Sequence, residues 1–289
     1  MLRVLNLGAG VQSTTLYLWA LDGHLQIDRA IFADTGDEPE AVYQHLELLR
    51  SLNGPEIEVV KPFSTSLSDN LIHGIKADEG SENLPEFVKR TNTVISIPTF
   101  LSNESRGGMG RRQCTGEFKI KPIERRIREL CGLVPGQRSK EPVAVQIMGL
   151  SFDEPKRVVN VKARFQSVAW TVPEFPLFDE FMTRADCVAY LQQRLPDYQV
   201  PRSACVFCPY HNDAEWKRVK AVQADWEKVV AVDKALRDPS SVCFSQMNSV
   251  QYLHRSRKPI EDVEFVDRPE SKQASLSFST MDCEGMCGV

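Results

Sequence analysis

The sequence predicts an α/β fold, in which a parallel sheet has helices on both faces and a smaller, mainly helical region follows it. Three short apolar segments, within residues 4–7, 29–34 and 56–60, are typical of buried strands. The segments between them, residues 13–21 and 40–52, have the apolar spacing of helices. Strands that alternate with helices favour parallel pairing, because each helix returns the chain across one face of the sheet.

The composition is that of an ordinary globular chain. The 289 residues are 42% hydrophobic and 26% charged, and they suffice for one large domain or one domain with an appendage. No apolar run approaches the ~18 residues of a membrane helix, and the chain opens on a strand rather than a signal peptide. We therefore expect a cytoplasmic protein that has no contact with a membrane.

A glycine-containing loop follows the first strand. Residues 8–13 read Gly-Ala-Gly-Val-Gln-Ser and lead into the first helix. Small residues let the backbone approach a ligand closely, and the free N–H groups at a helix start suit a phosphate. The candidate nucleotide-binding residues of this segment are Gly8, Ala9, Gly10, Gln12, Ser13 and Thr14.

Three interpretations of this loop remain once a Walker loop is excluded, because no Gly-Lys-Ser/Thr sequence closes it. The pair Gly8 and Gly10 fits a dinucleotide fingerprint, for which Asp34 would bind the ribose. The hydroxyl of Ser13 fits a pyrophosphate-binding loop of the PP-loop type. The third interpretation is an ordinary strand-to-helix turn.

The second strand ends in Asp34, Thr35 and Gly36, before a helix that starts after a proline. Ligands of parallel sheets bind at the carboxyl ends of the strands, where this segment and the first loop both fall. We expect Asp34, Thr35 and Gly36 to line a nucleoside pocket that prefers adenine.

The middle of the chain is irregular and basic. Residues 62–113 contain a short helix near 67–75 and a Gly/Arg-rich stretch, and we interpret them as a lid or substrate loop. Residues 106–128 hold eight Lys or Arg and two Glu, which indicates either a solvated helix face or an anionic ligand. A helix is expected over residues 123–130.

A buried strand is predicted at residues 143–150, followed by residues 151–157. Arg157 has the fork geometry to hold a phosphate or sulfate, with a surface salt bridge as the plainer alternative. Beyond residue 170 the pattern predicts helices over residues 184–195 and 213–236.

Eight cysteines in a chain expected in the cytoplasm favour metal or redox chemistry over disulfides. The pair Cys205 and Cys208 has the spacing that binds one metal or cluster across a tight turn. Structural zinc on this pair with Cys283 and Cys287 is one alternative, and a redox disulfide is another. Cys131, Cys187 and Cys243 are expected to be packed thiols, and His211 to have a capping or solvent role.

Five motifs in order, over residues 3–215, resemble the PP-loop superfamily and within it the phosphoadenylyl-sulfate reductase-like family. They are the loop at 8–13, the Asp-Thr-Gly segment at 34–36, the Cys/Lys/Pro segment at 114–122, the Gly/Glu/Arg segment at 149–157, and the Cys-x-x-Cys pair. Gly8, Gln12, Thr115 and Ser151 depart from the family's Ser, Asp, Cys and Arg. The resemblance implies an adenine-nucleotide alpha-hydrolase-like, Rossmann-like fold and assigns Gly149 to the nucleotide site.

The resemblance also implies a [4Fe–4S] cluster. Cys114 lies 91 residues before Cys205, an interval similar to that between the cluster cysteines of the adenylyl-sulfate reductases. It therefore assigns Cys114, Cys205 and Cys208 as ligands, with either an open iron or a tail cysteine at the fourth position. By the same resemblance the catalytic residues would be Lys119, Arg157, Cys283 and Cys287.

Two enzyme activities follow from the resemblance. One is ATP-dependent adenylation of a substrate followed by sulfur transfer, and the other is reduction of adenylyl sulfate or phosphoadenylyl sulfate by a tail cysteine. A nucleotide- or nucleic-acid-binding regulatory protein is the non-enzymatic alternative. The expected domains are a nucleotide-binding unit (1–170) and a cysteine-bearing region (171–289). Expected partners are an adenine nucleotide with Mg²⁺, an anionic substrate for which nucleic acid is one candidate, a sulfur- or electron-donor protein, and a second copy of the chain.

Overall fold

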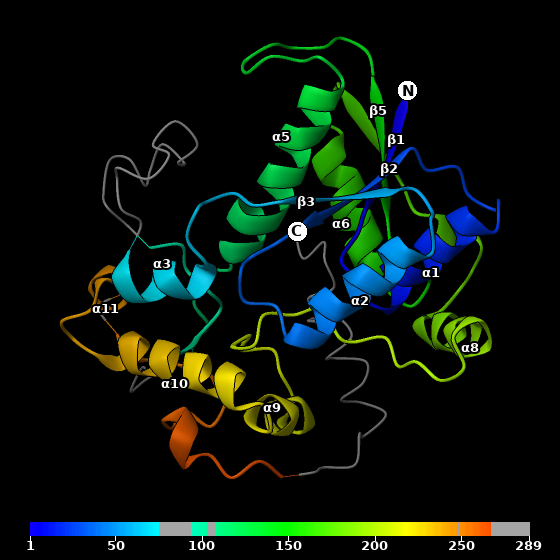
Figure 1. The fold of residues 1–289 in the computed structure, drawn as a ribbon. Coiled ribbons are helices and arrows are strands. Elements are labelled where there is room, and N and C mark those ends of the chain that lie inside the picture. Colours follow the sequence, from blue (N-terminus) through cyan, green and yellow to red (C-terminus); the bar gives the residue numbers. More distant parts are fainter. Residues whose placement is uncertain (75–93, 103–107, 248, 267–289) are drawn as a thin grey trace.

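A computed structural model describes residues 1–74, 94–102, 108–247 and 249–266 of the chain. Its centre is a five-stranded sheet in which all neighbouring strands pair parallel (Figure 1). The predicted α/β fold class is therefore confirmed. The strands, in their order across the sheet, are β3 (Glu56–Val60), β2 (Arg29–Ala33), β1 (Leu2–Asn6), β5 (Ala144–Met148) and β6 (Thr171–Glu174).

The central strands are buried on both faces, as their nearly continuous apolar sequence requires. Alternate residues of β1 separate between two cores: Val4 belongs to one cluster and Leu5 to the other. Helices α1 (Val11–Leu21), α2 (Glu40–Ser51) and α8 (Arg184–Arg194) supply the cluster that contains Leu5. Helices α5 (Lys121–Leu130) and α6 (Pro155–Phe165) supply the other, and α7 (Pro176–Asp179) contacts α1.

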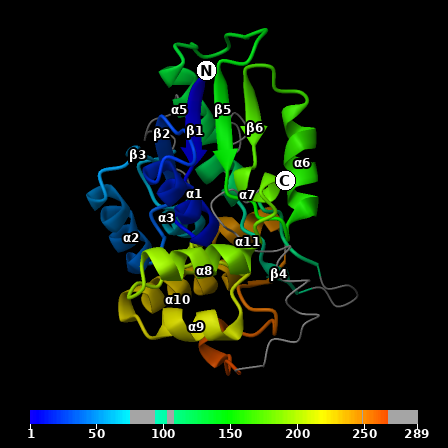
Figure 2. The same ribbon diagram turned by 90° about the vertical axis from the view of Figure 1, so that its right-hand side faces the viewer.

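A helical layer packs beyond the carboxyl edge of the sheet (Figure 2). It has its own apolar core around the fully buried Trp216, with side chains from α3, α9 and α10. Its elements are α3 (Leu67–His73), α9 (Asp213–Lys220), α10 (Gln223–Arg237), α11 (Val242–Met247), the 3₁₀ turn Ile260–Asp262, and the antiparallel pair β4 (Phe100–Leu101) and β7 (Gln251–Tyr252).

Several expected elements are confirmed. The third strand matches β3, and the helices expected at 40–52 and 184–195 match α2 and α8 to within one residue. The helix expected at 67–75 is α3 as far as His73, and residue 75 lies outside the described residues. The sheet also extends past the expected domain boundary, because β6 follows residue 170 and pairs with β5. That boundary stays a prediction.

Two expected helices were wrong in their limits. The helix expected at 213–236 is two helices, because Val222 is extended (φ −104°, ψ 106°) and separates α9 from α10. This break lets Trp216 and Val229 face one common core. The helix expected at 123–130 continues from a π-helical turn, Thr115–Ile120, which joins α5 directly. Pro122, which has no N–H to donate, lies two residues after the π-helical turn ends.

Candidate functional site

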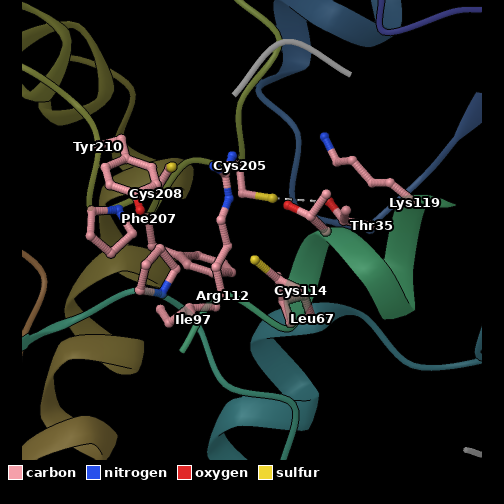
Figure 3. A pocket seen from close by; sticks show the side chains of 13 residues that line it. Thr35, Leu67, Ile97, Arg112, Cys114, Lys119, Cys205, Phe207, Cys208 and Tyr210 are labelled. Carbon is pink, nitrogen blue, oxygen red and sulfur yellow. Dashed lines mark hydrogen bonds between the residues drawn. The ribbon is translucent and has the colours of Figure 1, made fainter. Parts of the chain in front are cut away.

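Three cysteines from two distant segments line one pocket (Figure 3). Cys114 lies at the start of the π-helical turn, and Cys205 and Cys208 lie in the loop that precedes α9. Arg112 and Lys119 also line this cavity, which has a volume of about 30 Å³. The structure thus brings together the three cysteines that the resemblance grouped, and we call this cavity the thiol pocket.

The Cys205 loop is held in place by backbone hydrogen bonds. The Val206 N–H donates to the Asp37 carbonyl (2.9 Å), which fixes the loop to the segment after β2. His211 Nε2 lies 2.9 Å from the Cys205 carbonyl oxygen. Burial and the nearby Arg202 charge lower the pKa of His211 to about 3, so this imidazole is neutral and donates Nε2–H. Its place in the loop is that of a structural cap.

A buried ion pair forms one wall of the thiol pocket. Lys119 Nζ lies 2.9 Å from Glu38 Oε1, and the two side chains are 5% and 0% exposed. Burial alone would lower the pKa of Lys119, but the Glu38 carboxylate and the nearby Cys205 raise it above its usual value. The lysine is therefore a fixed cation beside the thiols.

Thr35 connects the end of β2 with the thiols. Its hydroxyl lies 3.3 Å from Cys205 Sγ (Figure 3). The same hydroxyl lies 3.5 Å from Glu38 Oε1. Glu38 was not among the site residues expected from the sequence. The signal for it was weak, since it is one of several acids after the second strand and nothing local pairs it with a lysine 81 positions away.

Two of the three thiols, Cys114 and Cys205, are protonated at neutral pH while no metal is bound. Burial raises the pKa of Cys114 and that of Cys205, and the Glu38 charge adds to the rise at Cys205. A metal or cluster would have to displace these protons, because thiolates are the ligands. Among the described residues no group of three or more His, Cys, Asp or Glu side chains is arranged closely enough to hold a single metal ion.

The glycine loop, residues 8–13, adopts a tight and internally bonded turn. Ala9 has a positive φ of 57°, a conformation that costs a side-chain-bearing residue roughly 1–2 kcal/mol. Ser13 Oγ lies 3.3 Å from both the nitrogen and the oxygen of Gly10. A Cβ atom on Gly149 would lie 2.9 Å from the Ser13 nitrogen, so only glycine fits where β5 ends against this loop.

Side chains near the glycine loop are engaged with protein partners. Gln12 donates to Ser151 Oγ (3.3 Å) and Glu154 Oε2 (3.2 Å), and it accepts from Arg184 (2.9 Å). Arg157 pairs with Glu154 and does not line the thiol pocket. The Arg157 and Glu154 side chains are 15% and 5% exposed, so this pair is largely buried rather than a surface salt bridge, and a role of Arg157 in anion binding stays a prediction. Thr14 Oγ1 lies 2.8 Å from His45 Nε2.

The Asp34 carboxylate is likewise bound by protein partners. Its Oδ1 accepts from the Gly36 N–H and the Tyr43 hydroxyl, both at 2.8 Å, and Lys61 Nζ lies 3.1 Å from Oδ2. Gly36 has a φ of 77°, which favours glycine. Asp34 therefore shapes the loop after β2, while Thr35 in the same loop faces the thiol pocket.

The remaining predicted residues can be placed only in part. Cys283 and Cys287 lie outside the described residues, as do positions 75–93 and 103–107 of the expected lid. Cys187 and Cys243 are buried in apolar clusters, and Cys131 is partly buried against one, as expected for packed thiols.

No family model matches the sequence, and neither the curated proteins nor the solved structures give a significant match. In the part of the chain that the structure describes, every helix is too short or too polar to cross a membrane.

Proposed function

We propose that this chain is a PP-loop enzyme of the phosphoadenylyl-sulfate reductase-like family, which binds ATP or an adenylyl nucleotide and transfers sulfur to an adenylated substrate. The observation that carries the proposal is the thiol pocket. Cys114 and the Cys205–Cys208 pair are 91 residues apart in sequence, yet they line one cavity beside the loop that follows β2. If these cysteines were only packed thiols, the fold would not need to bring Cys114 next to the Cys205–Cys208 pair.

The nucleotide would bind where the strands end. The glycine loop lies after β1, residues 34–36 after β2 and Gly149 after β5, and these three strands are neighbours in the sheet. The N–H groups at the start of α1 suit a pyrophosphate. Thr35 and Glu38 lie between this edge and the thiols, which supports a path from an activated substrate to a sulfur site.

The donor set of the thiol pocket fits an iron–sulfur cluster in kind. Three thiols are soft ligands, and Arg112 adds a positive charge that would offset an anionic cluster, whereas Lys119 is already paired with Glu38. Cys114, Cys205 and Cys208 would hold it, and Thr115 stands where a fourth thiolate would complete a four-cysteine site. When bound, such a cluster would supply an iron position for sulfur. The reductase alternative depends on Cys283 and Cys287, which lie outside the described residues.

Parallel incubations test this proposal. Anaerobically purified protein is given ATP with Mg²⁺, adenylyl sulfate or phosphoadenylyl sulfate, and pyrophosphate and sulfite are measured. We expect pyrophosphate from the incubation with ATP, and about four irons per chain. Sulfite release from either sulfated nucleotide would instead favour the reductase activity.

Matched cysteine variants complete the test. Cys205→Ala should lose iron and turnover together, whereas Cys187→Ala, in the core under α8, should keep both. Stoichiometric zinc without iron after anaerobic reconstitution would contradict the cluster.

A further inference from the structure

A second cavity, lined by side chains of α8 and α9, is much larger than the thiol pocket. Its volume is about 540 Å³, within the roughly 300–1,000 Å³ of pockets that bind small organic ligands. Residues 196–202, in the loop that runs from α8 to α9, form one wall (Figure 2). Val11, the first residue of α1, lies at the cavity as well. We call it the α8–α9 cavity.

Two hydrogen-bonded connections join this cavity to the glycine loop and the first turn of α1. Arg184, which lines the cavity, donates from Nη1 to Gln12 Oε1 (2.9 Å). The hydroxyl of Tyr198, also in the lining, lies 3.1 Å from His45 Nδ1, and His45 Nε2 lies 2.8 Å from Thr14 Oγ1. Burial lowers the pKa of His45 to about 4, so this imidazole is neutral at pH 7. The cavity and the glycine loop therefore share one buried wall.

The same wall leads to the thiols. Arg202 is the last residue of the loop to line the cavity, and Cys205 follows it three residues later. The Val206 N–H then fixes this segment to the Asp37 carbonyl. A molecule in the cavity would lie beside the glycine loop at one end and close along the chain to Cys205 at the other.

The lining combines an apolar floor with a basic rim. Val188, Leu191 and Val200 belong to the apolar cluster under α8 or pack against it. The charged residues of the lining are three arginines and two acids: Arg184, Arg202, Arg218, Asp197 and Glu215. Arg202 pairs with Glu215, whereas Arg218 is exposed and has no ion pair among the described residues. Arginine side chains in an excess of positive charge suit the oxygens of a phosphate.

We propose that the α8–α9 cavity binds a phosphate ester with an apolar, ring-sized body. The body packs on Val188 and Leu191, and the phosphate contacts Arg218. The assignment of this molecule as the sulfur acceptor rests on the proposed function, because an acceptor has to reach both the nucleotide and the thiols. Its binding to the cavity rests on the lining alone.

Calorimetric titration of the full-length chain with phenyl phosphate, in the absence of ATP, tests the binding. We expect saturable binding to the wild-type protein. Inorganic phosphate and phenol should each bind at least ~10-fold more weakly, because each lacks one half of the ligand. Arg218→Gln should weaken phenyl phosphate about 10-fold, as for a lost charge-assisted contact, and Arg218→Lys should weaken it less. The matched control is Lys217→Gln, at the exposed neighbouring residue outside the lining, which should bind like the wild type.

A second titration keeps this inference apart from the proposed function. Saturating ATP with Mg²⁺ should leave the affinity for phenyl phosphate unchanged, because the two ligands occupy different sites. Phenyl phosphate binding without pyrophosphate release from ATP would contradict only the proposed function. An absence of phenyl phosphate binding to the wild type, its displacement by ATP, equal affinity for inorganic phosphate, or equal affinity in Arg218→Gln would each overturn the assignment of the cavity.

Discussion

The glycine loop and the thiol pocket lie at the same edge of the sheet but differ in how completely their polar groups are paired. Every buried side-chain nitrogen or oxygen of residues 8–15 has a hydrogen-bond partner, and Gln12 alone has three partners. At the thiol pocket and its wall, Arg112 Nη2, Thr115 Oγ1 and Glu38 Oε2 are buried and lack a hydrogen-bond partner among the described residues.

This difference distinguishes two kinds of site. The side chains of the glycine loop are held by protein partners, and the Gly10 N–H is itself bonded to Ser13 Oγ. The thiol pocket contains buried polar atoms that lack hydrogen-bond partners among the described residues. Each such atom carries a free-energy cost, which a bound ligand that pairs with it would relieve. The predictions below change one region at a time and compare it with the other.

The largest effect is expected at the buried ion pair. Lys119→Met leaves Glu38 as a buried carboxylate without its cation, which should lower the free energy of unfolding by ~3–5 kcal/mol in urea denaturation at neutral pH. The double variant Lys119→Met/Glu38→Gln removes both charges and should recover most of the loss. An equally large loss in the double variant would mean that the pair contributes through packing rather than charge.

A smaller effect is expected where β5 meets the glycine loop. Gly149→Val places side-chain atoms against the backbone of Gln12 and Ser13, and it should cost ~1–3 kcal/mol and abolish nucleotide binding. The control is Gly116→Ala in the π-helical turn, because an added Cβ there meets nothing within 4 Å. That variant should keep its nucleotide affinity and lose no stability. Unchanged nucleotide affinity in folded Gly149→Val would separate the glycine loop from nucleotide binding.

The two regions also differ in how far the sequence predicts them. The sheet and its first helices follow from apolar spacing, since β1, β2 and β5 carry mostly apolar runs and β3 combines Ile57, Val59 and Val60 with two glutamates. The glycine loop can be predicted because its features, a strand, small residues and a helix start, follow one another directly in the sequence. By contrast, β6 contains Pro173 and is only four residues long, so periodicity does not mark it.

The thiol pocket depends on contacts that sequence spacing does not encode. The three cysteines were grouped by resemblance to a family rather than by spacing. The pairing of Glu38 with Lys119, the stacking of Arg112 on Tyr210 and the tie between Thr35 and Cys205 all join segments at least 70 residues apart. Such pairs form through the packing of the helical layer against the sheet edge, and periodicity within one segment carries no signal for them.

The smallest effects are expected around Asp34, whose partners Tyr43 and Lys61 can be removed one at a time. Tyr43→Phe removes the hydroxyl that donates to Asp34 Oδ1, and the acceptor is 5% exposed, so about 1 kcal/mol of stability should be lost. Lys61→Ala removes a partner whose side chain is 61% exposed, and it should change stability by less than ~0.5 kcal/mol, as for other solvent-screened ion pairs. Both values come from urea denaturation, with nucleotide affinity measured on the same samples.

Because the Gly36 N–H still holds Asp34 Oδ1 in either variant, adenine-nucleotide affinity should fall less than ~10-fold in Tyr43→Phe and stay unchanged in Lys61→Ala. If Lys61→Ala lost more stability than Tyr43→Phe, the exposed ion pair with Lys61 would stabilise the loop after β2 more than its buried hydrogen bonds do.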